Sequence, residues 1–337
     1  GYSLATGYFN NDIYADLAIG VPGEDVGNID SAGAVNVIYG SQWGLRHQGN
    51  QLWYQGNNGI QDSAEQANLY GHALATGDFN GDDLSDLAIG VLGEGPGGAG
   101  AVSIIYGSHT GLKYWDNQLW TQDSANIKGA AEPLDGFGAS LATGYFNNDI
   151  YADLAIGVNR EGIGNKAEAG AVNIIYGSAA GLTAAGNQLW HQDSTNIAGA
   201  SEIGDKFGSA LAVGDINNDG FSDLVVGVPN EDIGNIVNAG LINVIYGSAG
   251  GLTAQGNGTY RLDSEAGDRY GNALSVRDVN GDGYADIVIG IHGEGFSGLS
   301  AAGRISVLYG SPAGVRTHGE RVFHQDTPGI EGKAENN

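Results

Sequence analysis

The chain has 337 residues, and its 39 acidic and 13 basic side chains give a formal net charge of −26. This charge excludes nucleic-acid binding, because affinity for phosphates comes mainly from lysine and arginine. The chain has no cysteine, hence no disulfide or zinc-thiolate site, and no run of 18 apolar residues predicts insertion into a membrane. The absence of methionine indicates a processed or excised product, which is compatible with export.

Five copies of one unit run through the sequence. A segment similar to GASLATGYFNNDIYADLAIG recurs and aligns without a gap, starting at Gly1, Gly71, Gly138, Gly208 and Gly271. A period of this length is typical of proteins whose repeats stack against their neighbours. We therefore expect one domain, 1–337, built from repeats at about 1–70, 71–137, 138–207, 208–270 and 271–337.

Each copy predicts four strands in the same order. In the first copy, the strand near Gly1 leads through a polar loop to a second strand ending at Gly20. A third strand lies within 33–41, and the fourth ends near Trp53. These segments are short, aliphatic and bounded by Gly, Asn, Asp and Ser, and none has apolar residues at helical spacing. The chain is therefore predicted to be all-β, a β-propeller of four-stranded blades.

The repeats resemble FG-GAP repeats, which occur in the head of integrin α subunits and in bacterial surface proteins. Six short segments match the two parts of that signature: Phe137-Gly138, Phe207-Gly208, Tyr70-Gly71, Tyr270-Gly271, Gly20-Val21-Pro22 and Gly227-Val228-Pro229. The resemblance covers all five copies and implies a β-propeller. Five whole repeats favour a closed five-bladed ring, and the alternative is part of a seven-bladed, integrin-like ring.

The loop between the first and second predicted strands carries oxygen donors at alternate positions. In the fourth copy these are Asp215 at position 1, Asn217 at 3, Asp219 at 5, the Phe221 carbonyl at 7 and Asp223 at 9. Oxygen donors around a glycine turn suit Ca²⁺, whereas Mg²⁺ prefers a rigid octahedron with several retained waters. The loop is not an EF-hand, because position 12 is not Glu. It resembles the calcium-binding hairpin of FG-GAP repeats.

Two further copies carry the same donors, and two carry an incomplete set. The complete sets are Asp78, Asn80, Asp82, Leu84 (carbonyl) and Asp86, and Asp278, Asn280, Asp282, Tyr284 (carbonyl) and Asp286. In the first and third copies a tyrosine replaces the leading aspartate, which leaves possible weak sites at Asn10, Asp12, Asp16, Asn147, Asp149 and Asp153. The alternative interpretation is that these residues only form hairpin turns.

A glutamate recurs four residues after the glycine that ends the second predicted strand: Glu24, Glu94, Glu161, Glu231 and Glu294. The resemblance to integrins implies that this loop lies on the ligand-binding face, opposite the calcium hairpins. The glutamates are therefore candidates for a ligand face. Arg277, which replaces a glycine of the other copies, is a further candidate. Alternatively, each carboxylate accepts hydrogen bonds from its own loop or from the next blade.

Aromatic residues recur in the predicted outer strand: Trp53, Trp120, Trp190, Tyr260 and Phe323. Such side chains stack on sugar rings in lectins, and they also pack between repeats. Repetition in every unit favours packing, because an inter-repeat contact must be made by each unit.

The sequence contains no G-x-S-x-G, H-E-x-x-H or P-loop pattern. Residues present in several copies are poor catalytic candidates, because an active site is normally unique. We therefore predict a non-enzymatic, calcium-binding interaction or adhesion module with a protein or glycan ligand. Weak calcium sites fill only at extracellular concentrations, which favours a secreted or cell-surface location. The alternatives are a carbohydrate-binding lectin and, with less support, a calcium-dependent carbohydrate-active enzyme.

Overall fold

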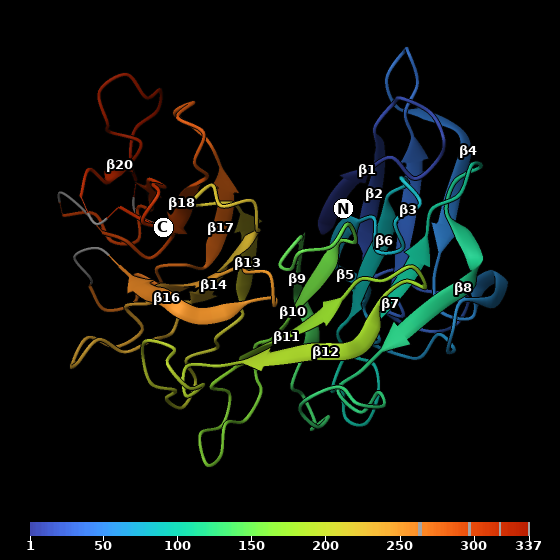
Figure 1. Ribbon diagram of the computed structural model, residues 1–337, viewed down its shortest axis with the longest axis horizontal. Helices are drawn as coiled ribbons and strands as arrows, with labels where there is room; N and C mark the ends of the chain where they lie inside the picture. The colour runs from blue at the N-terminus through green and yellow to red at the C-terminus, as the bar shows by residue number, and fades with distance from the viewer. Residues whose placement is uncertain (262–264, 296–297, 317, 336–337) are drawn as a thin grey trace. The chain divides into compact units, whose positions relative to one another are not determined.

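The computed structural model describes residues 1–261, 265–295, 298–316 and 318–335. In these ranges every regular element is a β-strand apart from one 3₁₀ turn, η1 (Asn57–Gly59) (Figure 1). The strands form five four-stranded sheets, one for each repeat, and strands consecutive in the chain are neighbours in each sheet. The predicted all-β fold of five propeller blades is confirmed. Ring closure and the single domain stay predictions, and the fifth predicted repeat includes residues outside the described ranges.

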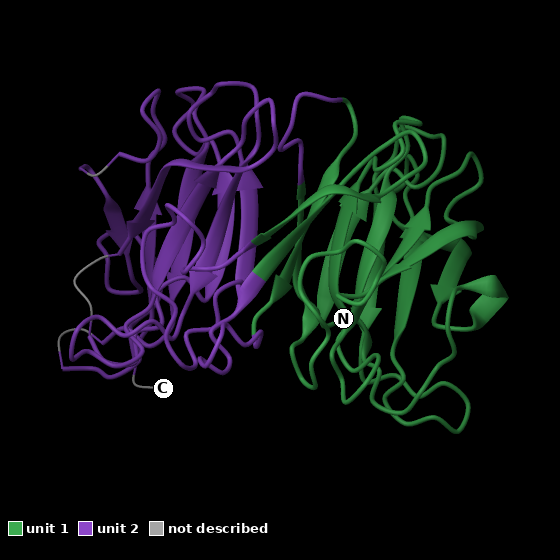
Figure 2. Cartoon of the chain, turned by 60° about the horizontal axis from the view of Figure 1, so that its bottom comes forward, with its two compact units in different colours: residues 1–143, 150–159, 172–189 green, residues 144–149, 160–171, 190–337 purple. Residues whose placement is uncertain are grey.

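Residue packing divides the chain into two compact units (Figure 2). Unit 1 comprises 1–143, 150–159 and 172–189. Its first sheet contains β1 (Ser3–Gly7), β2 (Asp16–Val21), β3 (Ala34–Tyr39) and β4 (Arg46–Trp53). The second contains β5 (Tyr70–Gly77), β6 (Asp86–Val91), β7 (Ala101–Tyr106) and β8 (Lys113–Trp120). Most of the third sheet also belongs to unit 1, with β9 (Phe137–Gly144), β10 (Asp153–Val158), β11 (Ala171–Tyr176) and β12 (Thr183–Trp190).

Unit 2 comprises 144–149, 160–171 and 190–337. The fourth sheet contains β13 (Ala210–Gly214), β14 (Asp223–Val228), β15 (Leu241–Tyr246) and β16 (Thr253–Tyr260). The fifth contains β17 (Ala273–Arg277), β18 (Asp286–Ile291), β19 (Arg304–Leu308) and β20 (Arg321–Phe323). No helix of the length and hydropathy that would cross a bilayer is found in the described part of the chain.

The central strands form the core of each blade. Every residue of β14 and β15 is buried, as is every residue of β6 and β7. A strand that is buried at every position is covered on both faces of its sheet, which explains why these segments are continuous aliphatic runs rather than alternating ones. In the fifth blade the first two residues of β19 are not buried.

The first two strands of each described hairpin share one register. Gly214 of β13 pairs with Asp223 of β14, and Gly77 and Arg277 pair with the equivalent aspartates of their own blades. Position 9 of the hairpin loop is therefore the first residue of the second strand. Because neighbouring strands are antiparallel, the hairpin and the glutamate loop that follows the second strand lie at opposite ends of the sheet.

An aromatic-glycine pair joins each repeat to the one before it. Phe207 is fully buried, and its N–H donates to the Ala169 carbonyl of the preceding repeat at 2.9 Å. The equivalent residues at the other three junctions, Tyr70, Phe137 and Tyr270, are also buried and make the same backbone contact. The "FG" part of the signature thus packs one repeat against the one before it.

Candidate metal-binding hairpins

The aspartate at position 9 is buried and anchors the hairpin in every repeat. In the fourth repeat, Oδ2 of Asp223 accepts the N–H of Ile216 and Oδ1 accepts the N–H of Gly247, both at 2.9 Å. Gly247 directly follows β15, so one carboxylate ties the hairpin to the third strand of the sheet. Asp16, Asp86 and Asp286 make the same two bonds, and Asp153 makes the one to Gly177.

The aspartate at position 1 organises the turn of the complete loops. In the fourth loop, the carboxylate of Asp215 accepts the N–H groups of Asp219 at 3.1 Å and Gly220 at 3.0 Å. Asp78 and Asp278 accept three backbone N–H groups each in the second and fifth loops. These bonds stabilise the ionised form and lower the pKa of Asp278, with the N–H of Gly283 as the largest cause.

Position 3 and position 5 also interact in all described loops. The Asp219 N–H donates to Oδ1 of Asn217, and the amide of Asn217 donates to Oδ2 of Asp219. The degenerate first and third loops keep the first of these bonds, between Asn10 and Asp12 and between Asn147 and Asp149, without a leading aspartate. The turn therefore forms without the complete donor set.

Position 6 requires a left-handed backbone conformation. Gly220 and Gly283 have φ values of 92° and 88°, and Asp83 adopts 66° at the same position of the second loop. The aspartate in the second loop is strained at this position, because a side chain disfavours positive φ. Position 7 lies at the next residue, Leu84, Phe221 or Tyr284.

The complete loops concentrate negative charge. Burial and, to a smaller extent, the charges of Asp219 and Asp215 raise the pKa of Asp223 to about 7. Asp86 has a pKa of about 8 for the same reasons. In the fifth loop the guanidinium of Arg316 lies 3.1 Å from Oδ2 of Asp282 and offsets part of this charge. The second and fourth loops have no such ion pair within the described residues.

Within the described ranges, no three His, Cys, Asp or Glu side chains are grouped in an arrangement that would hold a metal ion. Asp215 and Asp219 accept backbone N–H groups of the turn, whereas Asp223 accepts the N–H of Ile216. The donor set still fits Ca²⁺ chemically, since it consists of three carboxylates, an amide and a carbonyl, all hard oxygen donors.

The repeated glutamates are mostly buried. Glu24 is exposed, whereas Glu94, Glu161, Glu231 and Glu294 are buried. Gln55 and Gln192 of the preceding repeats donate to Glu94 and Glu231, and Arg304 pairs with Glu294 at 3.2 Å. Burial raises the pKa of Glu231 and of Glu294 to about 7. These contacts favour the structural interpretation, in which the glutamate links neighbouring repeats, over a solvent-facing ligand ring.

The other two candidate surfaces differ in exposure. Arg277 is exposed at the end of β17 and takes part in none of the ion pairs found among the described residues. Trp53 is buried, Trp120 and Trp190 are half-buried, and Phe323 is exposed. The three repeated tryptophans therefore do not form an exposed ladder.

Comparison with known families decides the identity of the repeats. The family model described as "FG-GAP repeat" matches residues 70–105, 207–244 and 270–308. These three segments are FG-GAP repeats. Each matched FG-GAP segment begins at the buried aromatic residue of a repeat and contains one of the three complete hairpin loops.

Curated proteins of two kinds are similar to parts of this chain. The chain is 33% identical to integrin alpha-V of Gallus gallus, in a match that covers 66% of this chain and 20% of the relative. It is 27% identical to integrin alpha-8 of Gallus gallus, and that match covers 88% of this chain and 27% of the relative. It is 35% identical to phosphatidylinositol-glycan-specific phospholipase D of Rattus norvegicus, in a match that covers 47% of this chain and 18% of the relative. The chain thus spans about a fifth of the length of the relatives it matches.

Sequence reasoning missed the structural role of position 9. The signal was present: Asp16 and Asp153 remain in loops whose position 1 is tyrosine. An aspartate that is present where the leading donor is absent is a candidate for a role that does not depend on a complete donor set.

Proposed function

We propose that this chain is a calcium-binding, non-enzymatic interaction module of the adhesion type that works outside the cytoplasm. The observation that carries the proposal is the complete oxygen donor set on three of five equivalent hairpins, each built on the same turn. Its similarity to integrin alpha chains supports an adhesive role.

The proposed Ca²⁺ ligands are those of the second, fourth and fifth loops. They are Asp78, Asn80, Asp82, Leu84 and Asp86; Asp215, Asn217, Asp219, Phe221 and Asp223; and Asp278, Asn280, Asp282, Tyr284 and Asp286. Bound Ca²⁺ would neutralise the clustered carboxylates and stabilise the hairpins. The first and third loops would bind weakly, because they lack the leading carboxylate.

We propose a protein rather than a glycan as the ligand. The tryptophans that recur in the outer strand are buried or half-buried, so they offer no repeated surface for stacking on sugar rings. Glu24 is the exposed glutamate of the candidate ligand face, so a protein ligand would contact it there. Arg277 is also exposed, but it pairs with Asp286 and so lies at the hairpin end of its own blade. Loss of glycan-array binding on Trp120→Ala would instead support a lectin, and turnover of a polysaccharide would support an enzyme.

Calcium dependence is expected to be visible in thermal unfolding. Each site with a dissociation constant of about 0.1 mM adds about 1.4 kcal/mol at 1 mM Ca²⁺. Three sites would therefore raise the melting temperature by about 5 °C or more over the value in EDTA. Circular dichroism melts in EDTA, Ca²⁺ and Mg²⁺ measure this, with Mg²⁺ expected to restore less than Ca²⁺.

The matched variants Asp219→Ala and Asp12→Ala test the assignment of sites. Both remove position 5 of a hairpin, but only Asp219 belongs to a complete donor set. In Ca²⁺, Asp219→Ala is expected to lower the melting temperature by about 3 °C more than Asp12→Ala, and in EDTA the two should be alike. Equal effects in Ca²⁺ would refute the distinction between complete and degenerate loops.

A further inference from the structure

A buried amide links the first two repeats through hydrogen bonds, at what we call the first junction. The Nδ2 of Asn68 donates to Oε1 of Gln55 at 2.8 Å and to Oε2 of Glu94 at 2.9 Å. Gln55 also donates to Oε2 of Glu94. All three side chains are buried, and each donor of this network meets an acceptor.

An aspartate replaces this asparagine at the third junction, between the third and fourth repeats. Asp205, like the asparagine, lies two residues before the aromatic residue that opens the next repeat. The Nε2 of Gln192 donates to Oε2 of Glu231 at 2.6 Å, as in the first junction. The Oε1 of Gln192 is buried and has no hydrogen-bond partner among the described residues. Because an ionised aspartate has no N–H to give, the third junction is one donor short.

The two carboxyl groups of the third junction are shielded from water. Asp205 is 1% exposed and Glu231 is 7% exposed. Burial and, to a smaller extent, the charge of Asp205 raise the pKa of Glu231 to about 7, and burial raises the pKa of Asp205 to about 6. Glu202 and Asp232 face the pair and raise both pKa values. Lys166, which forms an ion pair with another aspartate, lowers the pKa of Asp205.

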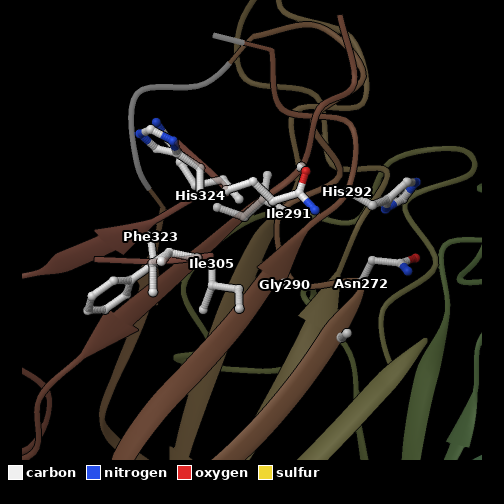
Figure 3. Close-up of a pocket in the computed structure, with 12 residues that line it drawn as sticks. Asn272, Gly290, Ile291, His292, Ile305, Phe323 and His324 are labelled. Carbon is white, nitrogen blue, oxygen red and sulfur yellow. The ribbon is translucent and has the colours of Figure 1, made fainter. Parts of the chain in front are cut away.

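The junction between the fourth and fifth repeats contains a cation as well. Asp268 stands at the same repeat position, and its carboxyl group lies within hydrogen-bonding reach of Glu294. Arg304 pairs with Glu294 at 3.2 Å and also lines a cavity of about 370 Å³, together with Ile305 and Phe323 (Figure 3). A guanidinium thus offsets charge at this junction. The ion pairs found among the described residues include neither acid of the third junction.

We infer that the third junction binds one proton, held between Asp205 and Glu231, where the first junction has the amide of Asn68. A protonated carboxyl group has an O–H to donate, which supplies the missing donor. The proton belongs to the pair rather than to one residue, because interacting carboxyl groups titrate together. The third junction is thereby a pH-sensitive link between two repeats. The inference does not depend on calcium, since neither acid is a donor of a hairpin loop.

The direction of the pH dependence follows from the raised pKa values. The ordinary values are 3.8 for Asp205 and 4.5 for Glu231, so the folded chain binds the proton more tightly than the unfolded chain does. The proton therefore stabilises the fold fully below these ordinary values. Its contribution is lost as the pH rises through about 6 to about 7.

The variant Asp205→Asn gives the third junction the amide of the first. Urea unfolding in EDTA, followed by circular dichroism at about pH 5 and about pH 8, measures its effect. At about pH 8 the unfolding equilibrium constant should be at least about 10-fold smaller in the variant than in the parent chain, because the variant keeps a donor that the parent has lost. At about pH 5, where the parent holds its proton, the two constants should agree within about 3-fold.

Two further variants separate the proton from other effects. Asn68→Asp makes the first junction resemble the third. It should raise the unfolding constant at least about 10-fold more at about pH 8 than at about pH 5. Glu202→Gln is the charge control, because Glu202 is exposed and its replacement removes a negative charge beside the pair without adding a donor to the buried network. It should change the pH profile by less than about 3-fold.

Three results would overturn the inference. The first is the same pH profile in the parent chain and in Asp205→Asn, since the third junction would then hold no proton. The second is an effect of Asn68→Asp that is equal at both pH values, and this variant tests the inference at a separate junction if Asp205→Asn does not fold. The third is a difference between parent and Asp205→Asn at about pH 8 that about 1 mM Ca²⁺ removes, because the pair would then bind a metal ion.

Discussion

Replacing Gly227 with alanine is expected to lower the free energy of unfolding by about 3 kcal/mol or more. The added methyl group would lie 2.1 Å from the Gly271 oxygen, which is backbone and cannot move without separating the fourth and fifth blades. Urea unfolding followed by circular dichroism measures the loss. The effect should be as large in EDTA as in Ca²⁺, because the junction holds no metal ligand.

The control is Gly290→Ala in the next blade. A methyl group at either position meets the Cβ of its own blade's alanine at a similar distance, 3.3 Å for Ala210 and 3.2 Å for Ala273. The two sites differ because the methyl group at Gly227 also meets the carbonyl oxygen of Gly271, whereas the one at Gly290 meets only Ala273 among the described residues. Gly290→Ala is therefore expected to change stability by less than about 1 kcal/mol. Equal losses in the two variants would contradict the packing role of the aromatic-glycine pair.

Replacing Asp223 with alanine is expected to lower the free energy of unfolding by about 2–5 kcal/mol even in EDTA. The carboxylate is fully buried, and its loss leaves the N–H groups of Ile216 and Gly247 without their acceptor. Each orphaned buried donor costs about 1–3 kcal/mol. Urea unfolding in EDTA isolates this structural effect from any effect of metal binding.

Asp219→Ala is the matched control for Asp223→Ala. Asp219 is exposed, and its oxygens accept bonds within the turn. In EDTA its removal should change stability by less than about 1 kcal/mol. If Asp223→Ala were as mild as Asp219→Ala in EDTA, the aspartate at position 9 would not be an anchor of the hairpin.

The repeat pattern was enough to predict the fold. Hairpin register follows from the constant spacing between the end of the first strand and position 9, as the pairing of Gly214 with Asp223 shows. Four strands per repeat follow from aliphatic runs bounded by turn residues. Strand order within each blade then follows because consecutive antiparallel strands are joined by short loops.

The candidate sites were less predictable, because burial depends on neighbouring repeats. Glu94 and Glu24 occupy the same repeat position, yet Glu94 is buried and Glu24 is exposed. The partner that buries Glu94 is Gln55, which is 39 residues away in the previous repeat.

A calorimetric titration of Ca²⁺ into the chelator-treated chain tests the central claim most directly. The account predicts three bound ions per chain and loss of the binding heat in the combined variant Asp78→Ala, Asp215→Ala and Asp278→Ala. Each of these aspartates is exposed or half-buried and leads a complete donor set, so the combined variant should stay folded. No binding heat at about 1 mM Ca²⁺, or the same heat in the combined variant as in the parent chain, would contradict calcium binding by the hairpins.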